Sequence, residues 1–212
     1  MKSFLIYLVA LLVVTNCNCG TGHWRYKQGI IPEHVATVKV IPVWLDTNFS
    51  AQESKAIKDS IKEWNSVFNG QLVIRQEGEF NGKDQIKKYL IASKVMHQGW
   101  SIIRLNSNDS TISDVVETGD GTLAFVFGIG TGNLMVVVGD HIGLRDLKTI
   151  VMHEMGHLLG AYHVNARSLM SPKYGIGKDE VDCIDKVTVA QVAGYQNLNL
   201  KELNYCVTPD FE

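Results

Sequence analysis

The sequence predicts one α+β domain in which helices pack on a twisted, mixed sheet of about five strands. Three features indicate this: a strand–helix–strand opening, three further strand-like segments, and an amphipathic run over residues 144–159 that is typical of a helix lying on a sheet. The chain has 212 residues, 45% of them hydrophobic and 20% charged, which is enough for a full core. No linker-like stretch divides it, so residues 21–212 are expected to form a single domain.

Five segments are rich in β-branched and aromatic residues and are expected to be strands: 36–46, 71–75, 100–105, 122–127 and 133–142. Pro42 in the first of these marks a bulge or an edge, because proline has no N–H to donate to a central ladder. For residues 83–96, a short helix and a strand both remain open. The glycine-rich residues 128–132 join two expected strands, so they predict a loop and not a phosphate-binding site.

Three segments are expected to be helices. Ser50 and Glu53 form a capping box before the first, which ends at Asn69-Gly70. Its apolar residues recur at helical spacing: Ile57, Ile61, Trp64 and Phe68. The second helix spans residues 144–159. A second capping-box-like pattern over residues 188–191, beginning at Thr188, predicts a short last helix.

Residues 4–14, FLIYLVALLVV, follow Lys2 and form an apolar run of the length found in signal peptides. We therefore expect residues 1–20 to be a signal peptide and the protein to be secreted or otherwise extracytoplasmic. The alternatives are a buried core helix and a lipoprotein-type signal, in which a lipidated Cys17 would anchor the protein to a membrane. The formal net charge of −2 gives no electrostatic argument for nucleic acid, and no such partner is expected.

Cys183 and Cys206 are the two cysteines in the body of the chain, away from the apolar run. In an oxidising compartment they would form a disulfide that ties the last segment back to the domain. Two separate free thiols are the alternative.

Residues 153–163, HEMGHLLGAYH, have the spacing of a zinc site. His153 and His157 are four residues apart, so both imidazoles lie on one helix face and can bind one ion. Glu154 is rotated by about 100° from His153, which places it beside the metal, where a general base for a zinc-bound water belongs. Gly160 permits the turn that would return His163 as a third ligand. Three neutral imidazoles leave a fourth position for water, as in catalytic zinc sites.

This segment resembles the extended motif of metzincin metallopeptidases, His-Glu-x-x-His-x-x-Gly-x-x-His. Metzincins also have a methionine turn downstream of the third histidine, which Met170 matches. Pro172 and Tyr174 resemble the Pro-x-Tyr element of the matrixin branch, the matrix-metalloproteinase-like group, which lines the pocket for the substrate side chain after the scissile bond. Residues 121–125 resemble that branch's edge strand, which pairs with extended substrate. The sequence shows no histidine set for a second zinc, so one catalytic Zn²⁺ is expected.

The resemblance implies a metzincin-like catalytic domain and an exported zinc endopeptidase that acts on protein or peptide substrates, as a monomer. Glu154 would be the catalytic base, and His153, His157 and His163 the metal ligands. Two alternatives remain: a non-catalytic, zinc-containing binding module, and a zinc hydrolase of a non-protein amide. Glu154 argues against the first because a glutamate is not needed to hold the ion.

Overall fold

The computed structural model describes residues 25–27, 38–82, 99–112, 116, 121–127, 130, 133–143, 146–172 and 181–207. The predicted signal peptide, the ambiguous segment 83–96 and Tyr174 lie outside these residues. The described elements, in chain order, are β1 (Arg25–Lys27), β2 (Lys39–Asp46), α1 (Ala51–Phe68), β3 (Leu72–Phe80), β4 (Trp100–Leu105), β5 (Ala124–Phe127), β6 (Leu134–Val138), α3 (Gly139–Ile142), α4 (Leu147–Leu158), α5 (Lys186–Gln196), the 3-10 helix η2 (Leu200–Glu202) and β7 (Tyr205–Val207).

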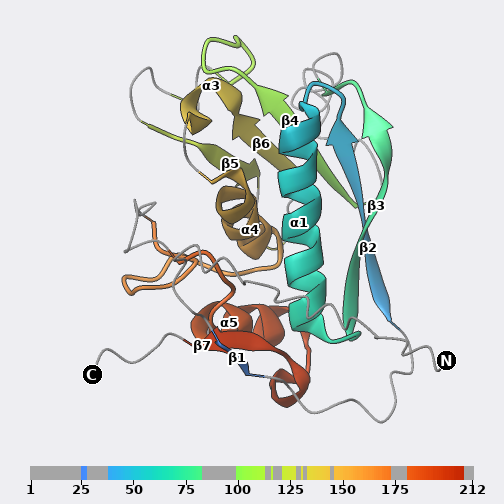
Figure 1. Cartoon of the computed structure of the whole chain (residues 1–212), viewed down its shortest axis with the longest axis vertical. Coiled ribbons are helices and arrows are strands. Elements are labelled where there is room, and N and C mark those ends of the chain that lie inside the picture. The colour runs from blue at the N-terminus through green and yellow to red at the C-terminus, as the bar shows by residue number, and fades with distance from the viewer. Residues whose placement is uncertain are drawn as a thin grey trace, which may run out of the picture.

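Five of the strands form one mixed sheet in the order β3-β2-β4-β6-β5. β3, β2, β4 and β6 run parallel to one another, whereas β5 runs antiparallel to β6 and forms one edge. In Figure 1, α1 and α4 lie against the same face of this sheet, and α5 lies below them. The predicted α+β class and the mixed sheet of about five strands are therefore confirmed.

A bulge follows Pro42, but the extra residue belongs to the neighbouring strand. Val43 pairs with Gln76 and Trp44 with Gly78, which leaves Glu77 as the additional residue in β3. A side chain at Gly78 would not fit, because its Cβ would lie 2.8 Å from the Trp44 ring. β4 pairs with β2 only from Val43 onward, so Pro42 lies beyond the part of β2 that β4 covers.

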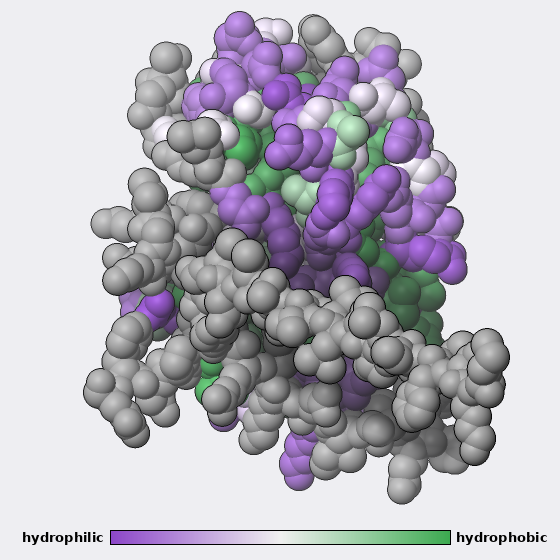
Figure 2. Space-filling view, viewed as in Figure 1, coloured by the Kyte–Doolittle hydropathy of each residue, from purple (hydrophilic) through white to green (hydrophobic). Residues whose placement is uncertain are grey.

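The predicted capping box begins α1. The Ser50 side chain accepts from the backbone N–H of Glu53 (3.2 Å), and the Glu53 carboxylate accepts from the Ser50 N–H (2.8 Å). Asn69 ends the helix in the left-handed conformation, with φ 49°. Hydrophilic side chains cover the outer face of α1 (Figure 2). The buried apolar residues of this helix belong to the main core.

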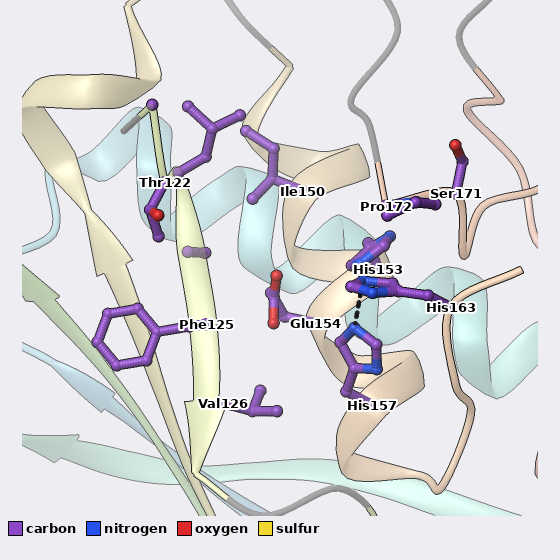
Figure 3. A pocket seen from close by; sticks show the side chains of 13 residues that line it. Thr122, Phe125, Val126, Ile150, His153, Glu154, His157, His163, Ser171 and Pro172 are labelled. Atoms are coloured by element: carbon purple, nitrogen blue, oxygen red, sulfur yellow. Dashed lines mark hydrogen bonds between the residues drawn. The ribbon is translucent and has the colours of Figure 1, made fainter. Parts of the chain in front are cut away.

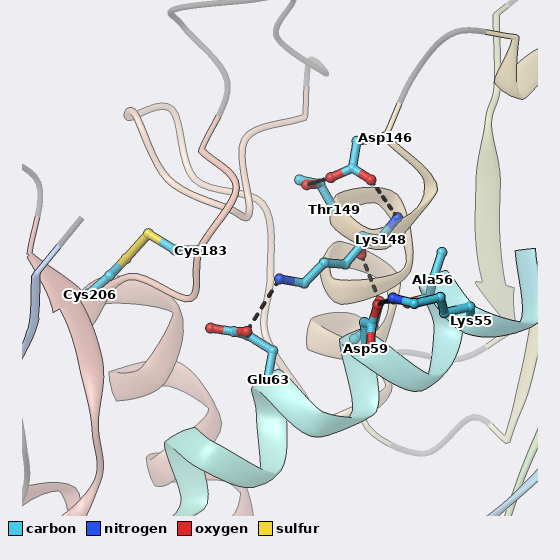
Figure 4. A network of polar contacts seen from close by, with 10 residues as sticks. Lys55, Ala56, Asp59, Glu63, Asp146, Lys148, Thr149, Cys183 and Cys206 are labelled. Carbon is cyan, nitrogen blue, oxygen red and sulfur yellow. Dashed lines mark hydrogen bonds and ion pairs between the residues drawn. A yellow bond between two sulfur atoms is a disulfide. The ribbon is translucent and has the colours of Figure 1, made fainter. Parts of the chain in front are cut away.

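Polar contacts join α1 to α4 along their shared length. The Trp64 indole donates to the Met152 carbonyl (3.1 Å), and the Ser60 hydroxyl donates to the Lys148 carbonyl (2.9 Å). Lys148 also forms an ion pair with Glu63 at 3.3 Å (Figure 4). These contacts fix α4, which carries the histidine motif, relative to α1.

The sheet buries apolar side chains on both faces. Met135 and Val137 of β6 face the main core under α1 and α4, whereas Leu134, Val136 and Val138 join a second cluster on the opposite face. A strand that is buried on both sides has apolar residues at every position. This explains why the sequence LMVVV of β6 shows no alternation of apolar and polar residues.

Three predicted elements had wrong boundaries. The strand expected at residues 71–75 continues to Phe80. The expected strand 133–142 ends at Val138, because residues 139–142 turn into α3, where the Asp140 carboxylate accepts from the Ser107 N–H and hydroxyl at 2.8 and 2.6 Å. The last helix does not begin after Thr188. Its N-cap is Asp185, whose carboxylate accepts from the backbone N–H groups of Val187 and Thr188. Thr188 lies inside the first turn.

The C-terminal end of the described chain folds back on itself. Cys183 and Cys206 form a disulfide, the pairing raised from the sequence, and β7 pairs antiparallel with β1. Among the described residues, no helix combines the length and apolar character needed to cross a membrane.

We expect Trp64→Phe to lower the free energy of unfolding by about 2–3 kcal/mol, because it removes the bond to α4 and leaves part of a fully buried ring's volume empty. Denaturant unfolding followed by circular dichroism measures this change. Lys55→Ala, on the exposed face of the same helix, is the control and should leave the free energy nearly unchanged. Equal effects of the two variants would contradict the role given to Trp64.

Candidate metal centre

Two of the three motif histidines are oriented by backbone carbonyls. In α4, the Nδ1 of His153 lies 2.6 Å from the Leu169 carbonyl oxygen, and the Nδ1 of His157 lies 2.8 Å from that of Ala161. A carbonyl oxygen only accepts, so both Nδ1 atoms carry the proton. Each Nε2 therefore presents a lone pair, which is the form of imidazole that binds a metal.

The chain leaves α4 through Gly160 and returns His163 to the same point. Gly160 has φ 100°, and a Cβ there would lie 2.2 Å from the Tyr195 ring. Both the conformation and the close approach require glycine. The Nε2 of His163 lies 3.2 Å from that of His153 and 3.1 Å from that of His157. The three imidazoles thus meet through the same ring nitrogen (Figure 3).

This donor set fits a zinc ion. Zn–N bonds of about 2.0–2.1 Å in a tetrahedral site place the nitrogens about 3.4 Å apart, close to the observed separations. The Nε2 atoms of His153 and His157 both carry lone pairs. One proton on the Nε2 of His163 can be donated to only one of them, whereas a cation between the three rings attracts all three Nε2 atoms. Within the described part of the chain, these three residues are the one such group with metal-ligating potential.

Burial sets the charges around the site. The pKa of His153 is lowered to about 4, mainly by burial and also by the neighbouring His157 and His163, although the bond to Leu169 acts in the opposite direction. Burial also lowers the pKa of His157. Glu154 is only 7% exposed, and loss of solvation raises the pKa of its carboxyl to about 8. His153 and His157 are therefore neutral at pH 7, as ligands must be, and Glu154 carries a proton easily.

Met170 lies in a tight turn in which the Ser171 N–H donates to the Ser168 carbonyl at 3.1 Å. It is fully buried, and a Cβ on Gly156 of α4 would come within 2.5 Å of its sulfur. The Met170 carbonyl accepts from the Val164 N–H at 2.9 Å, one residue after His163. The turn thus lies against α4 and bonds to the residue that follows the third histidine, while its role as a methionine turn remains a prediction.

A cavity of about 490 Å³ opens beside the histidines, between α4 and β5. Glu154 points into it from α4, toward β5, next to the imidazoles (Figure 3). The lining residues are 121–126, Ile150, His153, Glu154, His157, His163, Ser171 and Pro172. Pro172 is therefore at the cavity, as predicted, while the pocket role of Tyr174 remains a prediction because that residue is not described.

The edge strand β5 presents its outer backbone groups beside this cavity. Val138 N–H donates to the Leu123 carbonyl (2.9 Å), which makes this pair hydrogen-bonded in the β5–β6 ladder. Bonded and non-bonded pairs alternate in antiparallel strands, so the N–H and C=O groups of Ala124 and Val126 point away from β6. The predicted edge strand is thus an edge in the described sheet.

Sequence reasoning missed two residues that bind backbone groups beside the site. His141 of α3 contacts the Thr122 carbonyl through Nδ1 at 2.8 Å, next to the edge strand. Asp185 accepts from the Leu169 N–H at 2.8 Å, beside the carbonyl that orients His153. An Asp three residues before Thr188 is an N-cap signal, but nothing in the sequence indicates the contact to Leu169.

Residues 137–198 match the matrixin family model. This matrixin-like segment runs from β6 through the histidine motif and α5. Among solved structures, metalloproteinase-II from Bacteroides fragilis matches with a TM-score of 0.50 and 14% identity, over 80% of this chain and 56% of that one. The high choriolytic enzyme 1, a hatching enzyme zinc-protease from Oryzias latipes (medaka fish), matches with a TM-score of 0.34 and 15% identity, over 58% and 44%.

The chain spans about half the length of both structures. No curated protein sequence matches it. The family match and the shared fold with the Bacteroides fragilis structure confirm the resemblance to matrixin-like metzincins. The three-histidine cluster lies within the segment that matches the matrixin model.

The raised pKa of Glu154 predicts a pH-dependent stability. With a folded pKa of about 8 and an ordinary value of 4.5, the folded state binds this proton more tightly, so the stability it contributes is complete below pH 4.5 and is lost as pH rises through 8. In the presence of chelator, we therefore expect the free energy of unfolding of Glu154→Gln, relative to that of the wild type, to rise by on the order of a few kcal/mol between pH 5 and pH 9.

Thermal unfolding of both proteins across this range measures the gain. The opposite contribution of His153, whose folded pKa is lowered, is present in both proteins and cancels in the difference. Parallel stability curves would contradict the burial effect assigned to Glu154.

Proposed function

We propose that this protein is an exported zinc endopeptidase in which His153, His157 and His163 hold one Zn²⁺ and Glu154 is the catalytic base. The observation that carries the proposal is the convergence of three Nε2 atoms at 3.1–3.2 Å beside a buried carboxyl group in an open cavity. The match to matrixin over the same residues supports it.

A zinc ion in this site would polarise the substrate carbonyl and make a water molecule nucleophilic near neutral pH. Glu154 takes the proton from that water and later gives it to the leaving amine. Burial favours the protonated carboxyl, whereas a divalent cation nearby favours the carboxylate. These opposed effects bring the pKa of Glu154 toward the range in which it can both accept and donate a proton.

The open edge of β5 suits an extended peptide substrate. Ala124 and Val126 each offer an N–H and a C=O toward the cavity side, two residues apart, which matches the repeat of an added antiparallel strand. A non-protein amide without a regular peptide backbone could not use this repeat. The edge therefore favours peptide over the alternative amide substrates.

The cavity beside Glu154 has apolar walls. Leu123, Ile150 and Pro172 contribute to its lining, next to the metal ligands. We propose that this region, together with Tyr174, receives an apolar substrate side chain next to the scissile bond, because apolar walls stabilise apolar groups withdrawn from water.

Export is supported by the disulfide, since such bonds persist in oxidising compartments, and by the signal-like residues 4–14. We propose a secreted or extracytoplasmic monomer, with a lipid anchor at Cys17 as the alternative. Protein or peptide substrate is the proposed partner, and nucleic acid is not.

We expect Glu154→Gln to reduce peptide hydrolysis by at least about 10²–10⁴-fold while zinc stays bound, because the carboxylate transfers protons and does not ligate the metal. His157→Ala should lose both zinc and activity. The chain from Thr21 onward would be incubated with an unstructured protein, with and without a zinc chelator, and the fragments identified by mass spectrometry.

Internal cuts made by the wild type, stopped by chelator and absent with Glu154→Gln, are the expected result. A folded, zinc-loaded wild type that makes no cuts would contradict an endopeptidase. That outcome would favour the zinc-containing binding module or a hydrolase of a non-protein amide.

Val126→Pro tests the edge strand. Proline removes the outward N–H of residue 126 without removing a bond to β6, so kcat/KM for a long peptide should fall by about tenfold. Val126→Ala, which shortens the side chain but keeps the N–H, is the matched control. If both variants lose the same activity, or if neither does, the peptide does not pair with this N–H.

A further inference from the structure

Residues 183–185 and strand β7 (Tyr205–Val207) form one cross-linked unit, called here the disulfide unit. The Cys183–Cys206 bond closes it, and both cysteines are almost fully buried (Figure 4). The Cys206 N–H donates to the Ile184 carbonyl at 3.0 Å, and Asp185 pairs with Cys206 in an isolated parallel bridge. Asp185 is thus linked to β7 through the disulfide of Cys183, two residues earlier, and through the backbone pairing of residues 184 and 185 with Cys206.

The carboxylate of Asp185 binds in two directions. It is 5% exposed. Its Oδ1 accepts from the N–H groups of Val187 and Thr188 at 2.9 and 3.2 Å, which caps α5. Its Oδ2 accepts from the Leu169 N–H (2.8 Å) and from the hydroxyls of Ser168 (2.7 Å) and Thr188 (2.8 Å). Helix capping uses one oxygen, so the second is available to hold the turn at residues 168–171.

This turn contacts two of the three histidine segments. The Leu169 carbonyl accepts from His153 at 2.6 Å, and the Met170 carbonyl accepts from the Val164 N–H, next to His163, at 2.9 Å. Leu169 is therefore held through its N–H by Asp185 while its C=O orients His153. A continuous set of short contacts joins the disulfide unit to a ring whose Nε2 faces the metal position.

We propose that Asp185, fixed by the disulfide unit, is a positioning residue that sets the metal affinity of the site by orienting Leu169 and, through it, His153. This rests on the proposed zinc function of the three histidines. Partners that orient a histidine ligand typically change metal affinity by 10- to 100-fold when they are removed. The effect on His153 distinguishes this role from a purely structural helix cap.

Asp185→Asn is the direct test, because both carboxylate oxygens accept from backbone N–H groups. An amide in either orientation must turn its own NH₂ toward such a donor, at Leu169 or at Val187 and Thr188. The matched control is Asp46→Asn. Asp46 is 2% exposed, and its two oxygens accept from the N–H groups of Gly82 and Arg104, both at 3.1 Å, neither of which lines the metal cavity.

Zinc affinity would be measured by chelator competition, and the geometry of the site by the visible absorption of the cobalt(II)-loaded protein. For Asp185→Asn we expect zinc affinity to fall by about 10- to 100-fold and the cobalt bands to shift. Asp46→Asn should lower the melting temperature but leave both metal readouts at wild-type values. A Cys183→Ala/Cys206→Ala double variant should change the metal readouts in the same direction as Asp185→Asn.

Three outcomes would overturn the inference. Wild-type zinc affinity and cobalt spectrum in Asp185→Asn would show that Asp185 does not position His153. Equal loss of zinc in Asp46→Asn would show that the effect is general destabilisation. A wild type that binds neither zinc nor cobalt would refute the proposed metal site itself, and is distinguished from the first two outcomes because no variant is needed to see it.

Discussion

The hydrogen bonds from two imidazole Nδ1 atoms to the carbonyls of Leu169 and Ala161 are the constraint on which the site depends. They choose the tautomer, so the lone pairs of His153 and His157 lie on Nε2, and they stop the rings from rotating. Both carbonyls come from chain that follows α4. The segment after the helix must therefore fold back twice, first at Gly160 and then at the turn containing Met170, before the two helical histidines are usable ligands.

Features with a local physical cause could be predicted from the sequence. The capping box at Ser50, the apolar stripe of α1 and the four-residue spacing of His153 and His157 each follow from helical geometry within a few residues. The need for glycine at position 160 follows from the reversal required to return His163. The ligand set was predictable because most of it lies within one helix and the turn that ends it.

What could not be predicted depends on contacts between distant segments. Residues 139–142 follow an apolar strand, but Asp140 bonds to Ser107, more than 30 positions earlier, and the chain turns into α3. The sequence likewise suggests Thr188 as a cap, whereas the capping residue is Asp185, whose second oxygen reaches Leu169. The antiparallel direction of β5 is set by its pairing with β6. For α3 and for the bond between Asp185 and Leu169, the deciding partner is remote in the chain.

Burial shifts the pKa values of the two kinds of ionisable group in the site in opposite directions. It favours neutral His153, with a pKa of about 4, and neutral Glu154, with a pKa of about 8, because a low-dielectric surrounding disfavours either charge. Neutral histidines are ready to bind a cation, but a neutral carboxyl cannot accept a proton. A cation at the histidines stabilises the carboxylate next to it, so metal binding and the ionisation of Glu154 favour each other. The same burial that keeps the proposed ligands neutral thus makes the proposed base, Glu154, dependent on the metal, and a single ion would activate both parts of the proposed site.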